Sequence, residues 1–337
     1  HLLLEREGLI TRRRGRGIYV AEPNRRDEFE TSDKSWMSNA IAILAEVTGD
    51  FYTDHRQAGW AEFITRGAMK KIREAGCHAV VLHPDRLQGE ELEHFVADTQ
   101  QVIIVMDRLH AHEYPRMLKL VHALHRHGIQ PVVYGDWPEL ALYDRVVSDH
   151  EQGAYELARW LVSQGHRRIL NVWPQATAGY WFPARYAGYE RALREAGLEP
   201  LPPLQVLCEH PEFRFDDVWQ KDVRLLGGHL IEYLMGSEPV TAIMAHTDSA
   251  VPLVAQACML FNKKASRDIT LVGYDNYWRD LKLEDESFVP AASVDKRNMA
   301  IGQELVSLLL QRRAGTLPEE PQRHVVPARL VVMEPIS

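Results

Sequence analysis

The sequence predicts an α/β protein of two lobes, each a parallel sheet covered by helices on both faces. Continuous apolar runs of strand length alternate with amphipathic helical patterns, and this alternation extends from Asn39 almost to the end of the 337-residue chain. Strands buried on both faces are typically continuous apolar runs. A stretch of this length is too long for one such sheet, so two Rossmann-like lobes are expected.

The first residues predict a small basic unit. Residues 1–8 look like the end of a helix that stops at Gly8, so a preceding segment is expected. Strands are expected at Leu9–Thr11 and Ile18–Val20, joined by an Arg- and Gly-rich turn. The polar stretch Glu22–Lys34 is expected to be a linker.

Seven apolar runs are the expected strands of the two lobes. They are Ala40–Val47, Ala79–His83, Val102–Met106, Pro131–Tyr134, Ile169–Trp173, Thr241–Ala245 and Ile269–Tyr274. Helical spacing of apolar residues lies between them, for example at Leu157 and Leu161. Asp149 and Gln152 form a capping-box pattern at the start of that helix.

Composition and charge exclude several classes of protein. The hydrophobic fraction of 45% and the charged fraction of 26% are those of a globular protein, and no apolar run approaches the roughly 20 residues of a membrane-spanning helix. Three cysteines are too few for a disulfide framework or a zinc site, which favours a reducing, cytoplasmic location. Residues 1–26 hold seven arginines against three glutamates, whereas the whole chain has a net charge of -8. A basic end on an acidic body favours a polyanion-binding module joined to a body that does not bind nucleic acid.

The basic turn is the first candidate site. Arg12, Arg13, Arg14 and Arg16 concentrate positive charge at a hairpin tip thin enough to enter a minor groove. A solvated, charged turn is the alternative on charge alone. The string from Leu4 to Ile10, followed by Arg12 to Ala21, resembles the C-terminal half of a GntR-family winged helix. That resemblance implies a wing that contacts DNA, without the helix that reads the bases.

Five blocks of the body resemble the effector-binding core of the LacI/GalR repressors, relatives of periplasmic sugar-binding proteins. The blocks are Asp149–Ala154 with Gln164–Ile169, Arg185–Leu198, Ala242–Ala250, Asp268–Asn276 and Ala292–Asp295. The resemblance covers about residues 38–337 and implies the type I periplasmic-binding-protein-like fold. A GntR-like wing on a LacI-like body is similar to bacterial regulators of the arabinose-repressor type, which are homodimers that bind operator DNA and respond to a small sugar.

The resemblance implies an effector site between the lobes. Arg185 matches the arginine that binds sugar hydroxyls, and a planar guanidinium suits neighbouring hydroxyl groups. Asp275 matches the acidic acceptor and follows a strand, at the edge where open α/β sheets bind ligands. An ion pair between these two residues without any ligand is the alternative. Thr247 stands where the family has asparagine, and Asp248 is expected to cap the next helix.

Further cleft positions follow from the topology that the resemblance implies. Phe51 or Tyr52 could stack on a sugar ring, and Asp136 and Lys296 each follow a strand. Four aromatic residues are candidates for the cleft wall, with core or surface packing as the favoured alternative for each: Trp137, Tyr180, Trp181 and Phe213.

The expected domain division follows the same topology. Residues 1–21 are the remnant of a winged helix, 22–37 the linker and 38–337 the effector-binding and dimerisation domain. Within the last, lobe one is expected at about 38–148 and 295–322, and lobe two at about 149–294 and 323–337. Three segments would then cross between the lobes.

No enzyme, metal or cofactor motif was found. His112-Glu113 and His150-Glu151 lack the second histidine of a zinc-protease helix, and no nucleophile elbow or phosphate-binding loop is present. His122, His125 and His127 lie on one helix, where a solvated face is favoured over a metal site.

The sequence therefore predicts a DNA-binding transcriptional regulator, a repressor of a carbohydrate-utilisation operon. A small sugar-like effector would bind between its lobes. Its partners would be operator DNA, the sugar and a second copy of the chain, with no membrane and no cofactor. The alternatives are an exported sugar-binding protein of a transport system, which a signal peptide would favour, and an enzyme on a doubly wound fold, which turnover of a bound sugar would reveal.

Overall fold

The computed structural model describes residues 10–13, 17–20, 39–45, 60–99, 101–105, 114–174, 179–208, 217–265, 267–278 and 288–333. Contacts between residues divide the chain into two compact units, His1–Asn39 and Ala40–Ser337. In the described part of the chain, no helix is long and apolar enough to span a membrane.

The first unit contains the predicted hairpin. Strands β1 (Ile10–Arg13) and β2 (Gly17–Val20) pair antiparallel, with Ile10 opposite Val20 and Arg13 opposite Gly17. The arginines at positions 12 and 13 therefore belong to β1 rather than to the turn. The predicted helix end and the linker lie outside the described residues.

The first lobe is a six-stranded parallel sheet with strand order β13-β7-β6-β5-β3-β4. Its strands are β3 (Ala40–Ala45), β4 (His78–Leu82), β5 (Val102–Val105), β6 (Val132–Tyr134), β7 (Arg145–Ser148) and β13 (Arg323–Val326). Its helices are α3 (Trp60–Glu74), η2 (Pro84–Arg86), α4 (Glu90–Asp98), α5 (Tyr114–Arg126), η3 (Pro138–Leu142) and α10 (Asn298–Arg313). One core packs α3 and α10 against one face, and another packs α5 and α4 against the other.

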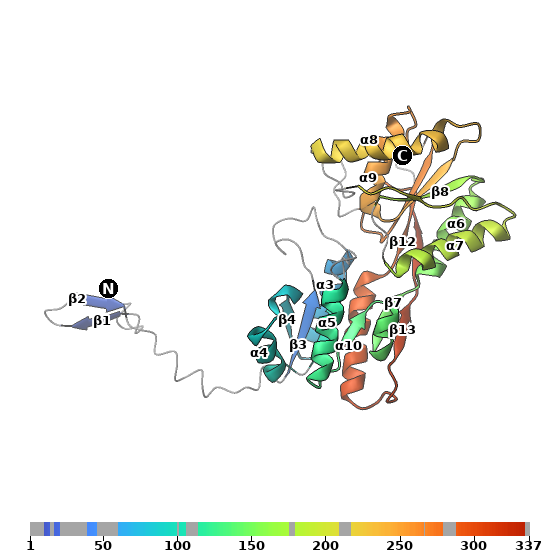
Figure 1. Ribbon diagram of the computed structural model, residues 1–337. Helices are drawn as coiled ribbons and strands as arrows, with labels where there is room; N and C mark the ends of the chain where they lie inside the picture. The colour runs from blue at the N-terminus through green and yellow to red at the C-terminus, as the bar shows by residue number, and fades with distance from the viewer. Residues whose placement is uncertain are drawn as a thin grey trace. The chain divides into compact units, whose positions relative to one another are not determined.

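The second lobe is also six-stranded, with strand order β14-β12-β11-β10-β8-β9. Its strands are β8 (Ile169–Trp173), β9 (Leu204–Gln205), β10 (Ala242–Ala245), β11 (Thr270–Tyr274), β12 (Ala292–Asp295) and β14 (Arg329–Val332). Its helices are α6 (His150–Ser163), α7 (Trp181–Glu195), α8 (Asp217–Met235), η4 (Asp248–Ala250) and α9 (Val251–Met259). Helices α8 and α9 cover one face and α6 and α7 the other, as Figure 1 shows. All strand pairs of this sheet are parallel except β12 with β14.

The prediction of two α/β lobes with helices on both faces is therefore confirmed. The chain passes between the sheets three times, after β7, after β12 and after β13. The predicted boundary placed residues 323–337 in lobe two, whereas β13 pairs with β7 in the first sheet and only β14 joins the second. Proline at position 327 lies between these two short strands and has no N–H to continue a ladder from one to the other.

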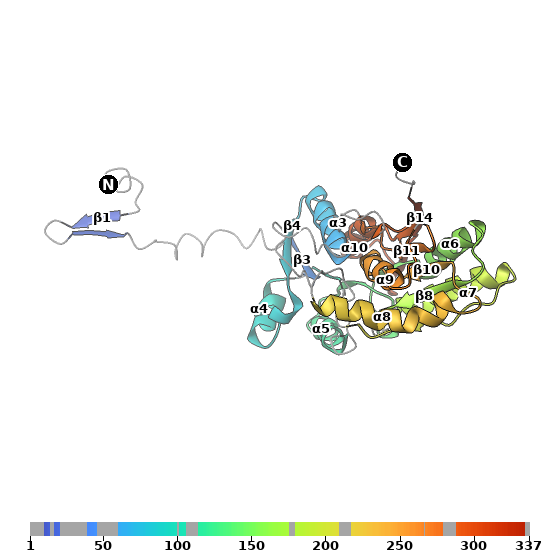
Figure 2. The same cartoon turned by 90° about the horizontal axis from the view of Figure 1, so that it is seen from above.

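Glycines allow two helix pairs to approach closely. In the α3–α10 pair, which Figure 2 shows side by side, a Cβ at Gly302 would lie 1.9 Å from the carbonyl oxygen of Ile64. A Cβ at Gly67 on the other helix would lie 2.1 Å from the carbonyl oxygen of Met299. In the α6–α7 pair, a Cβ at Gly188 would lie 2.0 Å from the carbonyl oxygen of Glu151. Gly188 thus sets the position of α7, the helix that carries Arg185.

Candidate functional site

A cluster of buried polar side chains lies where the parallel strands of the second sheet end. His246, Asp275 and Lys296 follow the carboxyl ends of β10, β11 and β12, and α6 and α7 contribute His150 and Arg185. All five are buried, with exposed fractions of 2% to 7%. The carboxyl edge of an open parallel sheet is the usual place for a ligand. We call these five residues the edge cluster.

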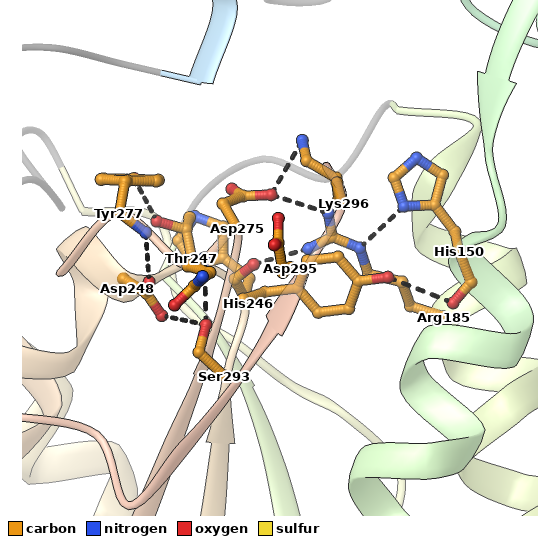
Figure 3. Close-up of polar contacts among 12 residues, drawn as sticks. His150, Arg185, His246, Thr247, Asp248, Asp275, Tyr277, Ser293, Asp295 and Lys296 are labelled. Atoms are coloured by element: carbon orange, nitrogen blue, oxygen red, sulfur yellow. Dashed lines mark hydrogen bonds and ion pairs between the residues drawn. The ribbon is translucent and has the colours of Figure 1, made fainter. Parts of the chain in front are cut away.

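Arg185 is held from several directions. Figure 3 shows its guanidinium between His150 and Asp275. Nε donates to His150 Nδ1 over 3.3 Å, and Nη1 donates to the carbonyl oxygen of His246 over 2.6 Å. The guanidinium carbon lies 3.5 Å from the ring centre of Tyr274. The remaining N–H groups of this fixed guanidinium point in defined directions and can donate to a ligand that has neighbouring oxygen atoms.

The structure brings Asp275 to Arg185, as the ion-pair alternative also requires. Arg185 Nη2 lies 3.8 Å from Asp275 Oδ1, and Lys296 Nζ lies 2.8 Å from the same oxygen. Asp275 has a φ of 91°, a backbone conformation that side chains other than glycine rarely adopt. Its N–H donates to the carbonyl oxygen of Val294 over 2.8 Å, which ties this loop to β12. Strain of this kind clusters at binding sites.

Lys296 links the second sheet to the first lobe. Its Nζ lies 4.2 Å from the ring centre of Trp60, the first residue of α3. The ring of Trp60 in turn meets Tyr134 edge-on, at a centroid distance of 5.5 Å. The predicted cleft position of Lys296 thus lies between the two lobes.

Thr247 and Asp248 have structural roles beside the cluster. The hydroxyl of Thr247 accepts from Ser249 N over 3.0 Å and caps η4, so the expectation that Asp248 caps this helix is wrong. Asp248 instead accepts from the N–H groups of Tyr277 and Trp278 and from Ser293 Oγ. Complete burial raises the pKa of Asp248 to about 8. It stabilises the loop that carries Asp275.

His150 and His246 are members of the edge cluster that sequence reasoning missed as ligand candidates. Burial, with Arg185 nearby, lowers the pKa of His246 to about 3 and that of His150 well below its usual value, so both imidazoles are neutral at pH 7. The available signal was positional, since His246 directly follows β10 and His150 opens α6.

Asp136 is neutralised by arginines from two strands. Arg145 Nε lies 3.1 Å from its Oδ1, and Arg323 Nη2 lies 2.6 Å from its Oδ2. Burial alone would raise the pKa of Asp136, but hydrogen bonds from Arg323 and Arg145 outweigh it and lower the pKa. These contacts weaken the prediction of Asp136 as an effector contact, because its carboxylate already has strong partners.

The aromatic candidates gather at the lobe junction. Tyr180 meets Trp137 of the first lobe edge-on at 5.6 Å and hydrogen-bonds Tyr134. Trp181 stacks on Trp173 at 5.4 Å, and the guanidinium of Arg185 lies over the Trp181 ring at 4.7 Å. Tyr180 also meets the ring of His150 at 5.7 Å, so Tyr180 and Trp181 both contact the edge cluster, and Trp137 packs on Tyr180.

Several predicted site residues lie outside the described part of the chain: Phe51, Tyr52, Phe213, Arg14 and Arg16. Arg12 and Arg13 are described only as backbone of β1. Within the described ranges, no group of three or more metal-ligating side chains exists. His122 and His125 both pack against the ring of Tyr143.

Comparison with curated proteins finds repressors. The HTH-type transcriptional repressor PurR of Vibrio campbellii is 25% identical over 199 residues, which cover 58% of this chain and 54% of the relative. The arabinose metabolism transcriptional repressor of Geobacillus stearothermophilus is 22% identical over 280 residues, covering 81% and 69%. The chain spans about half the length of the PurR relative.

Comparison with solved structures shows the fold. The transcriptional regulator CelR in complex with cellobiose has a TM-score of 0.63 at 21% identity, covering 87% of this chain and 83% of that one. A LacI-family regulator from Enterococcus faecium with bound ribose has a TM-score of 0.61 at 18% identity, covering 87% and 96%. The sequence pattern of the periplasmic binding protein-like domain matches residues 158–334, more than half of the chain. The chain belongs to the periplasmic binding protein-like domain family.

Proposed function

We propose that the chain is a DNA-binding transcriptional regulator, a repressor of a carbohydrate-utilisation operon, whose operator affinity is controlled by a small sugar-like effector bound between the two lobes. It catalyses no reaction and works as a homodimer in the cytoplasm. The buried pair of Arg185 and Asp275 carries this proposal. It places a fork of donors and a carboxylate acceptor side by side at the sheet edge, and a hydroxyl group is both a donor and an acceptor.

The DNA-binding part of the proposal rests on the β1–β2 hairpin. Four arginines lie in or between its strands, at positions 12, 13, 14 and 16. We assign the hairpin to the wing of a GntR-type winged helix, whose arginines contact phosphates or the minor groove. The relatives named above are transcriptional repressors, which supports the same class of function.

Effector control follows from contacts that cross between the lobes. Lys296 and Tyr180 of the second lobe touch Trp60 and Trp137 of the first. A sugar held by Arg185 and Asp275 in reach of these contacts would favour the closed arrangement through its higher affinity for that state. The change in lobe angle would then reposition the DNA-binding parts of a dimer.

An exported sugar-binding protein is the second candidate, because one fold serves both functions. The arginine-rich hairpin favours the regulator, since a transport protein has no use for a polyanion-binding tip. Binding of duplex DNA by the chain separates the two candidates.

A thermal-shift screen against pentoses, hexoses, sugar acids and sugar phosphates tests the effector. A sugar at 100 times its dissociation constant adds about 2.7 kcal/mol to the free energy of unfolding. For lobes of this size, that stabilisation raises the melting temperature by roughly 5 to 10 °C. A flat response of folded protein to every sugar and sugar derivative would contradict a sugar effector.

A further inference from the structure

At the carboxyl edge of the second sheet, four buried side-chain nitrogens have no hydrogen-bond partner among the described residues. They are His150 Nε2, both ring nitrogens of His246, and Trp173 Nε1. The three side chains are only 3% to 5% exposed. A buried polar group without a partner costs free energy, and such groups are rare in folded proteins. Their concentration at one sheet edge indicates that something outside the described residues supplies the missing partners.

The tautomer of His150 follows from its contact with Arg185. A guanidinium can only donate hydrogen bonds, so His150 Nδ1, at 3.3 Å from Arg185 Nε, must accept. The neutral imidazole then carries its proton on Nε2. Figure 3 shows this second nitrogen on the side of the ring away from Arg185. His150 therefore presents one N–H donor that needs an acceptor.

His246 presents one donor and one acceptor. Its backbone is held by Arg185, which donates to its carbonyl oxygen over 2.6 Å. Its ring stacks against Trp181 at 6.4 Å and lies 6.1 Å from the ring of Trp173. These contacts lie on the faces of the imidazole, and both nitrogens on its edge have no partner among the described residues. A neutral imidazole has one N–H and one lone pair to offer.

We propose that His150 and His246 hydrogen-bond hydroxyl groups of an uncharged sugar and thereby determine which effector the lobes accept. This assignment rests on the proposed function and adds two contact residues to it. The cluster mixes donors on Arg185 and His150, an acceptor on Asp275, and one of each on His246. Neighbouring hydroxyl groups satisfy such a mixed set. A phosphate or carboxylate group only accepts, so it would leave the acceptor nitrogen of His246 without a donor and would place a second negative charge beside Asp275.

The substitution His246→Phe tests the role of the imidazole nitrogens. Phenylalanine keeps the ring that stacks on Trp181 and removes both nitrogens. Calorimetric titration with L-arabinose, D-ribose and D-cellobiose is expected to show at least tenfold weaker binding of whichever sugar binds the wild type. Without sugar, the melting temperature of the variant is expected to rise, because two unsatisfied buried atoms are gone. A packing role alone would lower the melting temperature and leave the affinity unchanged.

The substitution His150→Asn provides a second, independent test. An asparagine amide oxygen can take the place of Nδ1 as the acceptor for Arg185, and the donor at Nε2 is lost. Binding of the same sugar is expected to weaken at least tenfold. His166→Asn is the matched control, because His166 hydrogen-bonds Thr241 through Nδ1 on an exposed part of the lobe. Its sugar affinity should equal that of the wild type.

The outcomes separate this inference from the function on which it rests. If the wild type binds a neutral sugar and both histidine variants bind it equally well, the two residues are not contacts and the proposed function stands. If the wild type binds a sugar phosphate or sugar acid more tightly than the matching neutral sugar, the assignment of an uncharged effector is overturned. If no sugar or sugar derivative binds, both proposals fail.

Discussion

The buried charges of the edge cluster are arranged so that one can be removed without leaving another alone. Asp275 has two cationic neighbours, Lys296 at 2.8 Å and Arg185 at 3.8 Å. An uncompensated buried charge is strongly destabilising, but truncation of Arg185 leaves Asp275 paired with Lys296. At the residue scale, binding and folding are therefore separable at this position.

Substitution Arg185→Ala is expected to abolish the response to sugar in a folded protein. Loss of a guanidinium fork that binds hydroxyl groups should weaken sugar binding by at least 100-fold, or about 2.7 kcal/mol. Calorimetric titration measures the affinity, and circular dichroism checks the fold. Arg191→Ala on the same helix is the control, because Arg191 pairs with Glu151 on the protein surface. Unchanged sugar affinity of Arg185→Ala would show that the site is elsewhere.

The raised pKa of Asp248 predicts that the free energy of unfolding falls as the pH rises from 6.5 to 8. Its folded pKa of about 8 lies above the ordinary value of 3.8, so the folded state holds a proton that the unfolded state has lost. The free energy of unfolding then falls with pH by up to about 1.4 kcal/mol per unit in this window. Asp248→Asn should remove this slope, since an amide does not titrate in this range and its oxygen can still accept from Tyr277 N. Urea unfolding at both pH values measures it, and equal slopes in the two proteins would refute the assignment.

Below pH 6.5, His246 and His150 change the free energy of unfolding in the direction opposite to Asp248. The folded pKa of His246 is about 3, below the ordinary value of 6.5, so its contribution to stability is complete above pH 6.5 and is lost as the pH falls toward 3. His150 shifts in the same direction. The combined effect of Asp248, His246 and His150 makes the free energy of unfolding greatest near pH 6.5.

At the scale of elements, glycine contacts set the spacing of the helix pairs that hold both lobes. Gly188 lets α7 lie against α6, and Gly302 lets α10 lie against α3. Because α10 follows the second crossing segment, its packing on α3 also fixes where Lys296 leaves the second sheet. The glycines in these two helix pairs thus help to position the edge cluster, although they are not part of it.

Gly302→Ala is expected to destabilise the first lobe. The new methyl group would meet the backbone of Ile64, which cannot move aside like a side chain, and overpacking of this kind costs about 1 to 3 kcal/mol or more. Gly228→Ala in α8 is the matched control, since a Cβ there meets nothing within 4 Å. Alanine is the better helix former, so the control should gain roughly 0.5 to 1 kcal/mol. Urea unfolding measures the free energy of unfolding of both variants. Equal changes in the two variants would argue against the close contact of Gly302 with Ile64.

At the scale of the whole molecule, the two proposed activities lie in separate compact units, Ala40–Ser337 for the sugar and His1–Asn39 for DNA. The two activities can therefore be removed one at a time. The hairpin supplies charge, which acts on any duplex, whereas the edge cluster supplies a shaped set of hydrogen-bonding groups. Salt should affect the first activity strongly and the second weakly.

Replacement of Arg12, Arg13, Arg14 and Arg16 by alanine is expected to weaken duplex DNA binding and to flatten its salt dependence. Each phosphate contact that is lost reduces the slope of log K against log salt by about 0.9. Fluorescence anisotropy of a labelled duplex at several salt concentrations measures the slope. Sugar affinity should be unchanged. If the variant keeps the wild-type slope, the hairpin does not contact DNA.

Local pattern predicted most of the strands, and its failures have physical causes. Runs such as Ile169–Trp173 are continuous and apolar, and they were found within one or two residues. Strand β7 was missed because only its central valines are apolar next to Arg145 and Ser148. Strand β13 was assigned to the wrong lobe because its partner, β7, lies far away in the sequence.

The site was predictable only in part. Arg185 and Asp275 came from a family resemblance that rests on several motifs. His150 and His246 carry only a positional signal, at a strand end and a helix start, because an unpartnered nitrogen is a property of three-dimensional surroundings. Asp136 was expected in the cleft, yet it is neutralised by Arg323, 187 residues further along the chain.

The sequence by itself determined the two α/β lobes and the basic hairpin, because the spacing of apolar residues and the distribution of charge can be read directly along the chain. Only the tertiary structure decided which side chains share the sheet edge, which of them are neutral, and which carboxylate is already paired. Burial and ion pairing join residues that are distant in sequence, and these interactions set both the pKa values and the hydrogen-bonding groups left for a ligand.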